Sequence, residues 1–278
     1  MDKVTVYITT YNRLERLKKA IESVLNQTYR NIEVIVSDDN STDGTQEYME
    51  EYIRKNKGVI YLRNKVNSGA CITRNNAISE ATGKYITGLD DDDVFTSDRI
   101  EKFINSWDDK YSFLCANFIE KFSDGTTQVY YKLGGDKVFS YEDLLFDNVA
   151  SNQIFTLTER LQSIKGFVPD VRRLQDWDTW LRLSYKYGFF LFIDECLYVM
   201  NHDHSSGEVR VSSSYSLNKA IEDFLYRNKI IFGPHFKRRK CYIDYLNKRL
   251  KFSDALYWAF VEKKPKNAIR YFYQFRRK

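Results

Sequence analysis

The sequence is poor in the residues that build linkers, disulfide frameworks and membrane spans. Three Pro and twelve Gly among 278 residues argue against a linker-rich or low-complexity architecture. The four cysteines stand singly without a CxxC pair, so we expect buried, reduced thiols in a cytosolic protein. No window approaches eighteen uninterrupted apolar residues, and no basic segment followed by an apolar one opens the chain. We therefore expect neither a spanning helix nor a secretory signal.

Charge is distributed unevenly along the chain. Residues 217–278 hold 17 Lys and Arg against 5 Asp and Glu, which leaves 26 against 33 in the first 216 residues. An acidic body with a basic tail indicates two separate tasks for the two parts. The acidic body also makes nucleic acid an unexpected partner.

The first 95 residues alternate between strand and helix patterns. Runs rich in Val, Ile and Tyr predict strands at 4–10, 32–38, 59–64 and 84–89. Apolar spacing predicts a helix over 13–27, Asp43 and Gln46 resemble a capping box that opens a second over 43–56, and Gly83 should end a third. This order predicts an α/β fold with a mostly parallel central sheet and helices on both faces.

The rest of the chain is less regular up to residue 216 and then helical. We expect further elements in the middle, namely helices at 97–107 and 177–187 and strands at 111–122, 127–133 and 189–199. These patterns divide the chain into a domain over 1–215, whose halves are 1–95 and 96–215, and a basic, aromatic helical extension over 216–278.

Open sheets of this kind bind ligands beyond the carboxyl ends of their strands. That rule brings four loops to one rim, at 9–13, 38–43, 64–69 and 90–93. Three of these loops are rich in Asp or Asn. None contains a GxGxxG or Walker A pattern, which excludes a dinucleotide fingerprint and a P-loop.

Four adjacent aspartates, Asp90 to Asp93, follow the fourth strand. A solvated turn before a helix capped by Thr96 or Ser97 would explain one or two of them. The full run favours Mg²⁺ or Mn²⁺, which bind few carboxylates and complete their shell with phosphate oxygens. In the second acidic loop, Asp39 either simply follows a strand or accepts hydrogen bonds from a uracil imide or a ribose.

Two later segments also allow two interpretations each. Asp176 and Trp180 share one helical face. This segment is either an ordinary amphipathic helix with acids in its first turn, or it places a carboxylate base beside an aromatic platform for a sugar. His202, His204 and Arg210 lie in a polar segment, which is either a surface loop or a site for metal and phosphate.

Taken together, these stretches resemble the family 2 glycosyltransferases, inverting enzymes of the GT-A fold. The resemblance runs in order over residues 3–212, through VYITTYNRLERLKKAIESVLNQTYRNIEVIVSDDNSTDGT, NSGACITRNNAISEATGKYITGLDDDD and QDWDTWLRL with the later H-x-H loop. It implies a metal-dependent, inverting transfer of a sugar from a nucleotide sugar, usually a UDP-sugar. The implied acceptor is a hydroxyl of a glycan or of a lipid-pyrophosphate-linked glycan in the synthesis of a surface polysaccharide, such as O-antigen or capsule.

The resemblance also implies roles for individual residues. The nucleotide-binding set is Thr9, Tyr11, Arg13, Asp39, Asn67, Gly69, Arg74, Asp90, Asp91 and Arg210. Asp92 and His204 match the ligands of Mn²⁺ or Mg²⁺, and Asp176 matches the general base. Gln175 stands where Glu is usual and His202 where Arg is usual, and both are assigned with Trp180 to the sugar or acceptor.

The basic tail and the reaction class each keep an alternative. Segment 235–278 mixes cations with aromatic residues, which suits peripheral attachment to the anionic inner face of the plasma membrane, or plain packing with solvated cationic faces. A dimer through the tail stays open. A nucleotidyltransferase would need a Gly-rich basic phosphate loop that is absent here, and an inactive nucleotide-sugar-binding module would not need Asp176.

Overall fold

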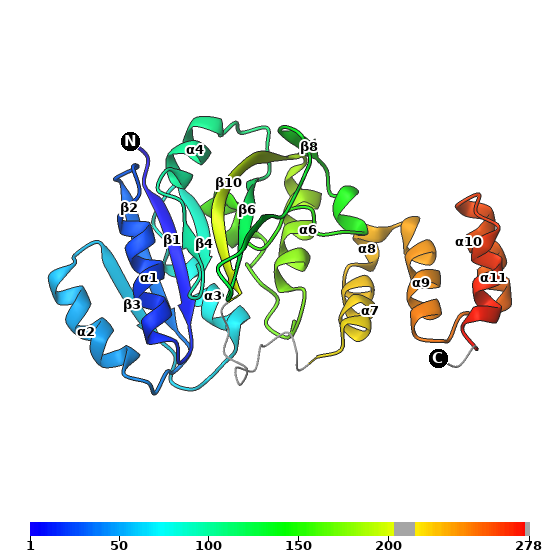
Figure 1. Ribbon diagram of the computed structural model, residues 1–278, viewed down its shortest axis with the longest axis horizontal. Coiled ribbons are helices and arrows are strands. Elements are labelled where there is room, and N and C mark those ends of the chain that lie inside the picture. The colour runs from blue at the N-terminus through cyan, green and yellow to red at the C-terminus, as the bar shows by residue number, and fades with distance from the viewer. Residues whose placement is uncertain (203–214, 276–278) are drawn as a thin grey trace. The chain divides into compact units, whose positions relative to one another are not determined.

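The computed structural model describes residues 1–202 and 215–275, and the chain divides into two compact units. Unit 1 comprises Met1–Val171 and Gln175–Glu208, and unit 2 comprises Arg172–Leu174 and Val209–Lys278. Unit 1 is built on one large sheet with flanking helices, and the described part of unit 2 is helical (Figure 1). No helix in these described ranges is long and apolar enough to cross a membrane.

The first part of unit 1 alternates strand and helix, as the sequence predicts. Its elements are β1 (Val4–Thr10), α1 (Leu14–Leu25), β2 (Ile32–Asp38), α2 (Thr45–Lys55), β3 (Val59–Arg63), α3 (Ala70–Glu80) and β4 (Tyr85–Asp90). β1 pairs in parallel with both β2 and β4, and β2 pairs in parallel with β3. The parallel βαβ arrangement expected for this part is therefore confirmed.

The second part of unit 1 continues the same sheet with mixed directions. Its elements are β5 (Val94–Phe95), α4 (Arg99–Ser106), β6 (Leu114–Phe122), β7 (Thr127–Val129), β8 (Lys137–Phe139), the 3₁₀ turn η1 (Asp143–Leu145), β9 (Phe155–Leu157), α5 (Thr158–Ser163), α6 (Gln175–Tyr187) and β10 (Phe190–His202). The order across the sheet is β3-β2-β1-β4-β9-β6-β10-β5. β9 is antiparallel to both of its neighbours, whereas β6 and β10 run parallel to each other.

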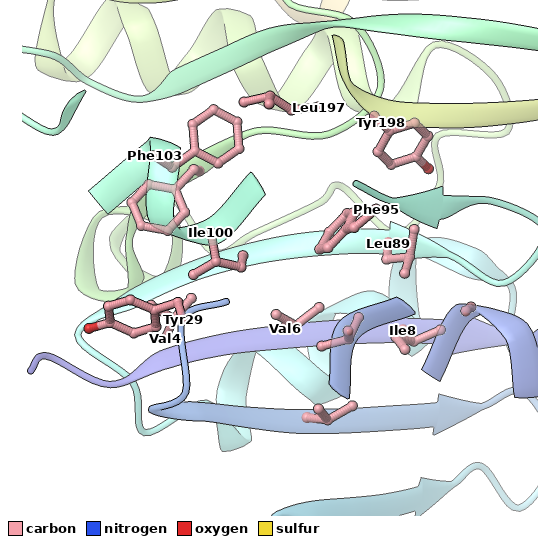
Figure 2. Packing of buried hydrophobic residues seen from close by; sticks show 14 of the residues in the cluster. Val4, Val6, Ile8, Tyr29, Leu89, Phe95, Ile100, Phe103, Leu197 and Tyr198 are labelled. Atoms are coloured by element: carbon pink, nitrogen blue, oxygen red, sulfur yellow. The ribbon is translucent and has the colours of Figure 1, made fainter. Parts of the chain in front are cut away.

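One face of this sheet forms the main core. Val4, Val6 and Ile8 alternate along β1 and are fully buried against α1, whose Leu17 and Ile21 face them one helical turn apart. Figure 2 shows the side chains of β1 on one side of this cluster and those of α4 and β10 on the other. The core thus fixes β1 and β4, whose carboxyl ends carry the candidate site.

Two details of the helix starts differ from the sequence prediction. α2 begins after Gly44, which has φ +89°, and Gln46 donates to Glu50 instead of reaching back to the helix start, so the expected capping box is absent. Asp43 instead accepts hydrogen bonds from the Leu14 and Thr45 amides, at 2.9 and 3.3 Å. Its carboxylate therefore ties the start of α1 to the loop before α2.

Unit 2 contains five helices within its described residues. They are α7 (Leu217–Arg227), α8 (Lys229–Phe232), α9 (His235–Leu246), α10 (Phe252–Val261) and α11 (Lys266–Tyr273). A separate small core joins α9 to α10, formed by Cys241, Leu250, Ala255 and Trp258 with four tyrosines around them. The helical character expected beyond residue 216 is confirmed for the described part.

Candidate active site

The register of the parallel strands gathers the predicted rim residues. Thr9 pairs with Asp90 across β1 and β4, and Thr10 pairs with Asp38 across β1 and β2. Because parallel strands end at the same edge of a sheet, the loops that follow β1, β2 and β4 leave from one rim. The acidic loop that begins at Asp91 therefore lies beside the loop that carries Arg13.

Arg13 connects these two loops through the acidic run. Its guanidinium donates to Asp91 Oδ1 at 3.1 Å and to Asp92 Oδ2 at 2.8 Å. Asp91 is buried, and burial together with the neighbouring charge of Asp92 raises the pKa of Asp91 to about 7, against the opposing pull of Arg13. Asp92 keeps 16% of its side chain exposed, so it is the more accessible of the two carboxylates.

The last acid of the run points into the protein. Asp93 is 4% exposed and accepts hydrogen bonds from the Tyr198 hydroxyl at 2.7 Å and the Asn201 amide at 2.8 Å. Burial, with the charges of Asp92 and Asp90, raises the pKa of Asp93 well above its ordinary value. Since Asn201 also donates to the Asp92 carbonyl at 2.8 Å, the end of β10 holds the acidic loop in place.

Arg74 of α3 joins three further residues into one cluster. It donates to Asp90 Oδ1 at 3.0 Å and to Gln175 Oε1 at 2.7 Å, and it lies 3.8 Å from Asp176 Oδ1. Burial alone would lower the pKa of Arg74, but the carboxylates of Asp176 and Asp90 outweigh that effect and raise it. The cluster joins α3, β4 and the start of α6 at the rim.

Asp176 has the properties of a general base. It stands in the first turn of α6, 24% of its side chain is exposed, and its Oδ1 accepts no hydrogen bond from the described residues. Burial raises the pKa of Asp176 to about 6, and the charge of Asp90 adds to that effect while Arg74 opposes it. A carboxylate with a raised pKa that keeps part of its side chain exposed is suited to take a proton near neutral pH.

Asp39 organises the loop that follows β3. Its carboxylate accepts hydrogen bonds from Asn64 Nδ2 at 2.8 Å and from the amides of Ser68 at 2.6 Å and Gly69 at 2.8 Å. Gly69 has φ +88°, which a residue with a side chain rarely adopts, and the chain enters α3 directly after it. Asp39 therefore orients the 64–69 loop, whichever ligand that loop meets.

The structure corrects one assignment and refines two others. Trp180 is fully buried, with its ring 5.7 Å from that of Phe167, so it cannot offer a face to a sugar. Gln175 accepts from Arg74 and donates to the Val171 carbonyl at 3.0 Å, so both of its polar ends are used by the protein. His202, at the end of β10, lies 2.9 Å from Glu120 Oε1.

The remaining predicted residues are exposed, partly buried or outside the described ranges. Tyr11 and Asn67 are exposed at the rim, and Thr9 is half-buried in β1. His204 and Arg210 lie outside the described residues. Asn75, which follows Arg74 in the chain, accepts from the amide of Phe167 at 2.8 Å and donates to its carbonyl at 2.7 Å, and so serves the fold.

The sequence prediction missed four residues that shape the site. Asn152 and Gln153 donate to Asp90 at 3.3 and 3.2 Å, and Tyr198 and Asn201 hold Asp93. Asn152 and Gln153 come from the irregular segment before β9, where no motif marks them. The strand expected at 189–199 contains Tyr198, but only the sheet order brings that residue to the acidic loop.

The described rim residues can supply only part of the coordination shell of a divalent cation. Among the described residues, no three His, Cys, Asp or Glu side chains are grouped to hold a metal ion. Asp92 offers carboxylate oxygens on the accessible side of the run, a donor type that Mg²⁺ and Mn²⁺ accept. These residues therefore fit a cation that takes its other ligands from a bound diphosphate, and they do not fit an all-protein cage.

The chain is similar to named glycosyltransferases and to solved structures, among them the following three. A protein of Escherichia coli strain K12, WcaA, assigned by name to colanic acid biosynthesis as a glycosyl transferase, is 31% identical over 265 residues, 91% of each chain. The crystal structure of S. aureus TarS 1–349 in complex with UDP-GlcNAc matches with a TM-score of 0.70 at 17% identity, over 98% of this chain and 79% of that one. A mannosyltransferase from Pyrobaculum calidifontis, in complex with GDP-Man and Mn²⁺, matches with a TM-score of 0.63 at 16% identity, over 97% and 74% of the chains.

These likenesses identify the fold and the family. The two solved structures show that the arrangement of β-strands and helices described above is that of the glycosyltransferase GT-A fold, which confirms the fold class expected from the sequence. The family described as Glycosyl transferase family 2 matches residues 5–164, more than half of the chain, and WcaA is similar over nearly all of it. The chain therefore belongs to glycosyl transferase family 2.

Proposed function

We propose that this chain transfers a sugar from a nucleotide sugar to an acceptor hydroxyl, with inversion at the anomeric carbon. The proposed donor is a UDP-sugar. The observation that carries the proposal is the Arg74 cluster, which brings Asp90, on the donor side, together with Asp176, the candidate base. A single displacement needs one carboxylate that takes the proton of the attacking hydroxyl. Asp176, with its raised pKa and partly exposed side chain, is the residue we assign to that role.

The rest of the rim would bind and orient the donor. Asp39 and the 64–69 loop are proposed to contact the base, and Asp90 the ribose. Arg13 carries a positive charge beside the acidic loop and would contact the phosphates, because guanidinium groups pair well with phosphate oxygens. Arg74 would hold the carboxylate of Asp176, the proposed general base, at a fixed separation from that of Asp90.

We propose a divalent cation, Mn²⁺ or Mg²⁺, at Asp92. When bound, such a cation would neutralise charge on the departing nucleoside diphosphate. Asp92 supplies a carboxylate oxygen, and Asp91 and Asp93 support its loop from inside the protein through Arg13, Tyr198 and Asn201. The Mn²⁺ in the complex of the similar mannosyltransferase supports this proposal.

The name of WcaA supports a role in building a polysaccharide. We propose a glycan acceptor, free or carried on a lipid pyrophosphate, and a place at the inner face of the plasma membrane. These two assignments rest on the family and on the basic tail, because the described rim contains no feature that selects one acceptor.

The test is release of UDP from a panel of UDP-sugars in the presence of Mn²⁺, with and without a chelator. We expect turnover with at least one sugar, its loss on chelation, and a loss of about 10²- to 10⁴-fold for Asp176→Asn. Asp178→Asn is not a suitable control, because that side chain is buried beside Arg182. Asp108→Asn, on the surface, is the matched control. Full turnover by Asp176→Asn would contradict the assigned base, and no turnover with any UDP-sugar of the panel would contradict the proposed transfer from a UDP-sugar.

A further inference from the structure

The α10 and α11 helices of unit 2 carry exposed apolar side chains in two rows. Phe252, Leu256 and Phe260 recur every four residues on α10 and are 48%, 49% and 84% exposed. Ile269 and Phe272, three residues apart on α11, are 50% and 60% exposed. Since residues three or four apart lie on the same side of a helix, each row is continuous. We call these five residues the hairpin face.

The two rows form one surface on a well-held pair of helices. The rings of Phe252 and Phe272 lie 6.2 Å apart, and α10 and α11 run side by side (Figure 1). On the other side of α10, Trp258 is buried in the small core of unit 2. Gln274 exchanges two hydrogen bonds with the Leu250 backbone, at 3.0 and 2.7 Å. The hairpin face is therefore the outer side of a packed element and not a frayed end.

Cations rim this face at both ends of the hairpin. The exposed ones are Lys248, Arg249, Lys251, Lys263, Lys264 and Lys266. Arg249 is paired with Glu222 at 2.7 Å and Lys264 with Glu262 at 3.6 Å. Residues 248–275 hold seven Lys and Arg against two acids, and neither acid is exposed. One of the two, Glu262, accepts from Arg238 Nε at 2.9 Å and keeps 15% of its side chain exposed. The surface around the apolar rows is consequently positive.

The more basic run on α9, by contrast, is used inside unit 2. Lys237 Nζ lies 4.0 Å from the centroid of the Tyr257 ring, and Arg238 is paired with Glu262. Lys240 is paired with Asp244, one helical turn away. Lys237 is exposed as well, but it lies over an aromatic ring, and Arg238 and Lys240 are paired with acids. The exposed cations close in sequence to the apolar rows are therefore those of residues 248–266.

We propose that the hairpin face docks on an anionic phospholipid surface. Its apolar rows would enter the interface between headgroups and acyl chains, and the rim of lysines would meet the phosphates. A second copy of the chain suits this face less well, because two such faces in contact would oppose lysine to lysine without an exposed acid between them. The inference rests on the proposed place at the membrane, to which it assigns a surface, and it is independent of the proposed sugar transfer.

Sedimentation of the full chain with vesicles tests the proposal. We expect it to sediment with vesicles of phosphatidylcholine and phosphatidylglycerol, to stay in solution with phosphatidylcholine alone, and to be released by high salt. The variant Phe260→Ser/Phe272→Ser should lose about tenfold or more in partition. Lys263→Glu/Lys266→Glu should lose binding to the anionic vesicles. Ile230→Ser, at an 86% exposed apolar residue of α8, and Lys57→Glu, on unit 1, are the matched controls and should bind as wild type.

The fold is retained if all four variants keep the far-UV circular dichroism spectrum and the UDP release of wild type in solution. Equal sedimentation of wild type and Phe260→Ser/Phe272→Ser would overturn the proposal. So would a dimer, seen by light scattering, that the same variant dissociates while no form of the chain binds vesicles. Vesicle binding is measured without turnover. The sedimentation result can therefore be interpreted even if the proposed sugar transfer fails.

Discussion

Four adjacent aspartates are compatible with a folded chain because they do not form four equal charges. Asp91 and Asp93 are buried, each accepts hydrogen bonds from the protein, and burial raises the pKa of both. Asp90 is paired with Arg74, and Asp92 with Arg13. Two acids thus support the loop from inside, and the other two lie at the rim, where each is paired with an arginine. This division follows from the direction in which each side chain points after the strand ends.

The raised pKa of Asp176 predicts a pH dependence of sugar transfer. A base acts in its deprotonated form, and a pKa of about 6 leaves Asp176 mainly protonated below that pH. We therefore expect kcat/KM to rise tenfold per pH unit up to about pH 6 and then to level off. A pH–rate profile with a saturating cation measures this limb. A flat profile from pH 5 to pH 8 would contradict the role of Asp176.

The charge of Arg74 predicts how that limb moves. Arg74 lowers the pKa of Asp176 against the effect of burial, so its removal should raise that pKa further. We expect the limb of Arg74→Ala to lie at higher pH than that of wild type, and the limb of Arg74→Lys, which keeps the charge, to stay close to wild type. A purely structural role for Arg74 would lower activity in both variants without moving either limb.

At the scale of elements, patterns within one stretch of chain were predictable and contacts between distant stretches were not. Most strands and helices of residues 4–90 follow from local patterns. β1, β2 and β4 are short, mostly apolar runs because both of their faces are buried, and α1 has helical apolar spacing because it buries one stripe. β9, three residues long and inserted between β4 and β6, carries no such pattern. Asn152 and Gln153, just before β9, reach Asp90 from more than sixty positions along the chain. Trp180 lies one helical turn after Asp176, a spacing that suggests a site residue, but its side chain is buried in the core.

Close packing at the centre of β4 predicts a large effect of a small substitution. A Cβ added to Gly88 would lie within 3.0 Å of Gln153 Oε1 and of the Tyr7 ring. We expect Gly88→Ala to lower the free energy of unfolding by about 1–3 kcal/mol and to weaken the support that Gln153 gives Asp90. Urea denaturation measures the first effect. Gly58→Ala is the control, since its Cβ would meet only the Ile32 carbonyl at 4.0 Å; equal stability of the two variants would contradict the prediction.

At the scale of the whole molecule, the chain combines two units with opposite charge. The acidic rim belongs to unit 1, and the exposed apolar rows with their lysines belong to unit 2. A site that concentrates carboxylates repels a nucleoside diphosphate unless cations accompany it, since both carry negative charge. Arg13 and Arg74 supply part of that compensation from unit 1 itself. Because the carboxylates that these arginines do not neutralise keep the rim negative, we expect the nucleotide and the divalent cation to bind together.

Thermal unfolding of the full chain tests this coupling. At a hundred times the dissociation constant a ligand stabilises the folded state by about 2.7 kcal/mol, which for a chain of this size raises Tm by about 5–10 °C. We expect UDP with Mn²⁺ to produce such a shift, and either alone to produce much less. Asp92→Ala should lose the part of the shift that needs Mn²⁺, whereas the surface variant Asp108→Ala should keep it. A shift with UDP that is the same with Mn²⁺ and with chelator would show that Arg13 and Arg74 suffice, and that Asp92 serves the loop and not a cation.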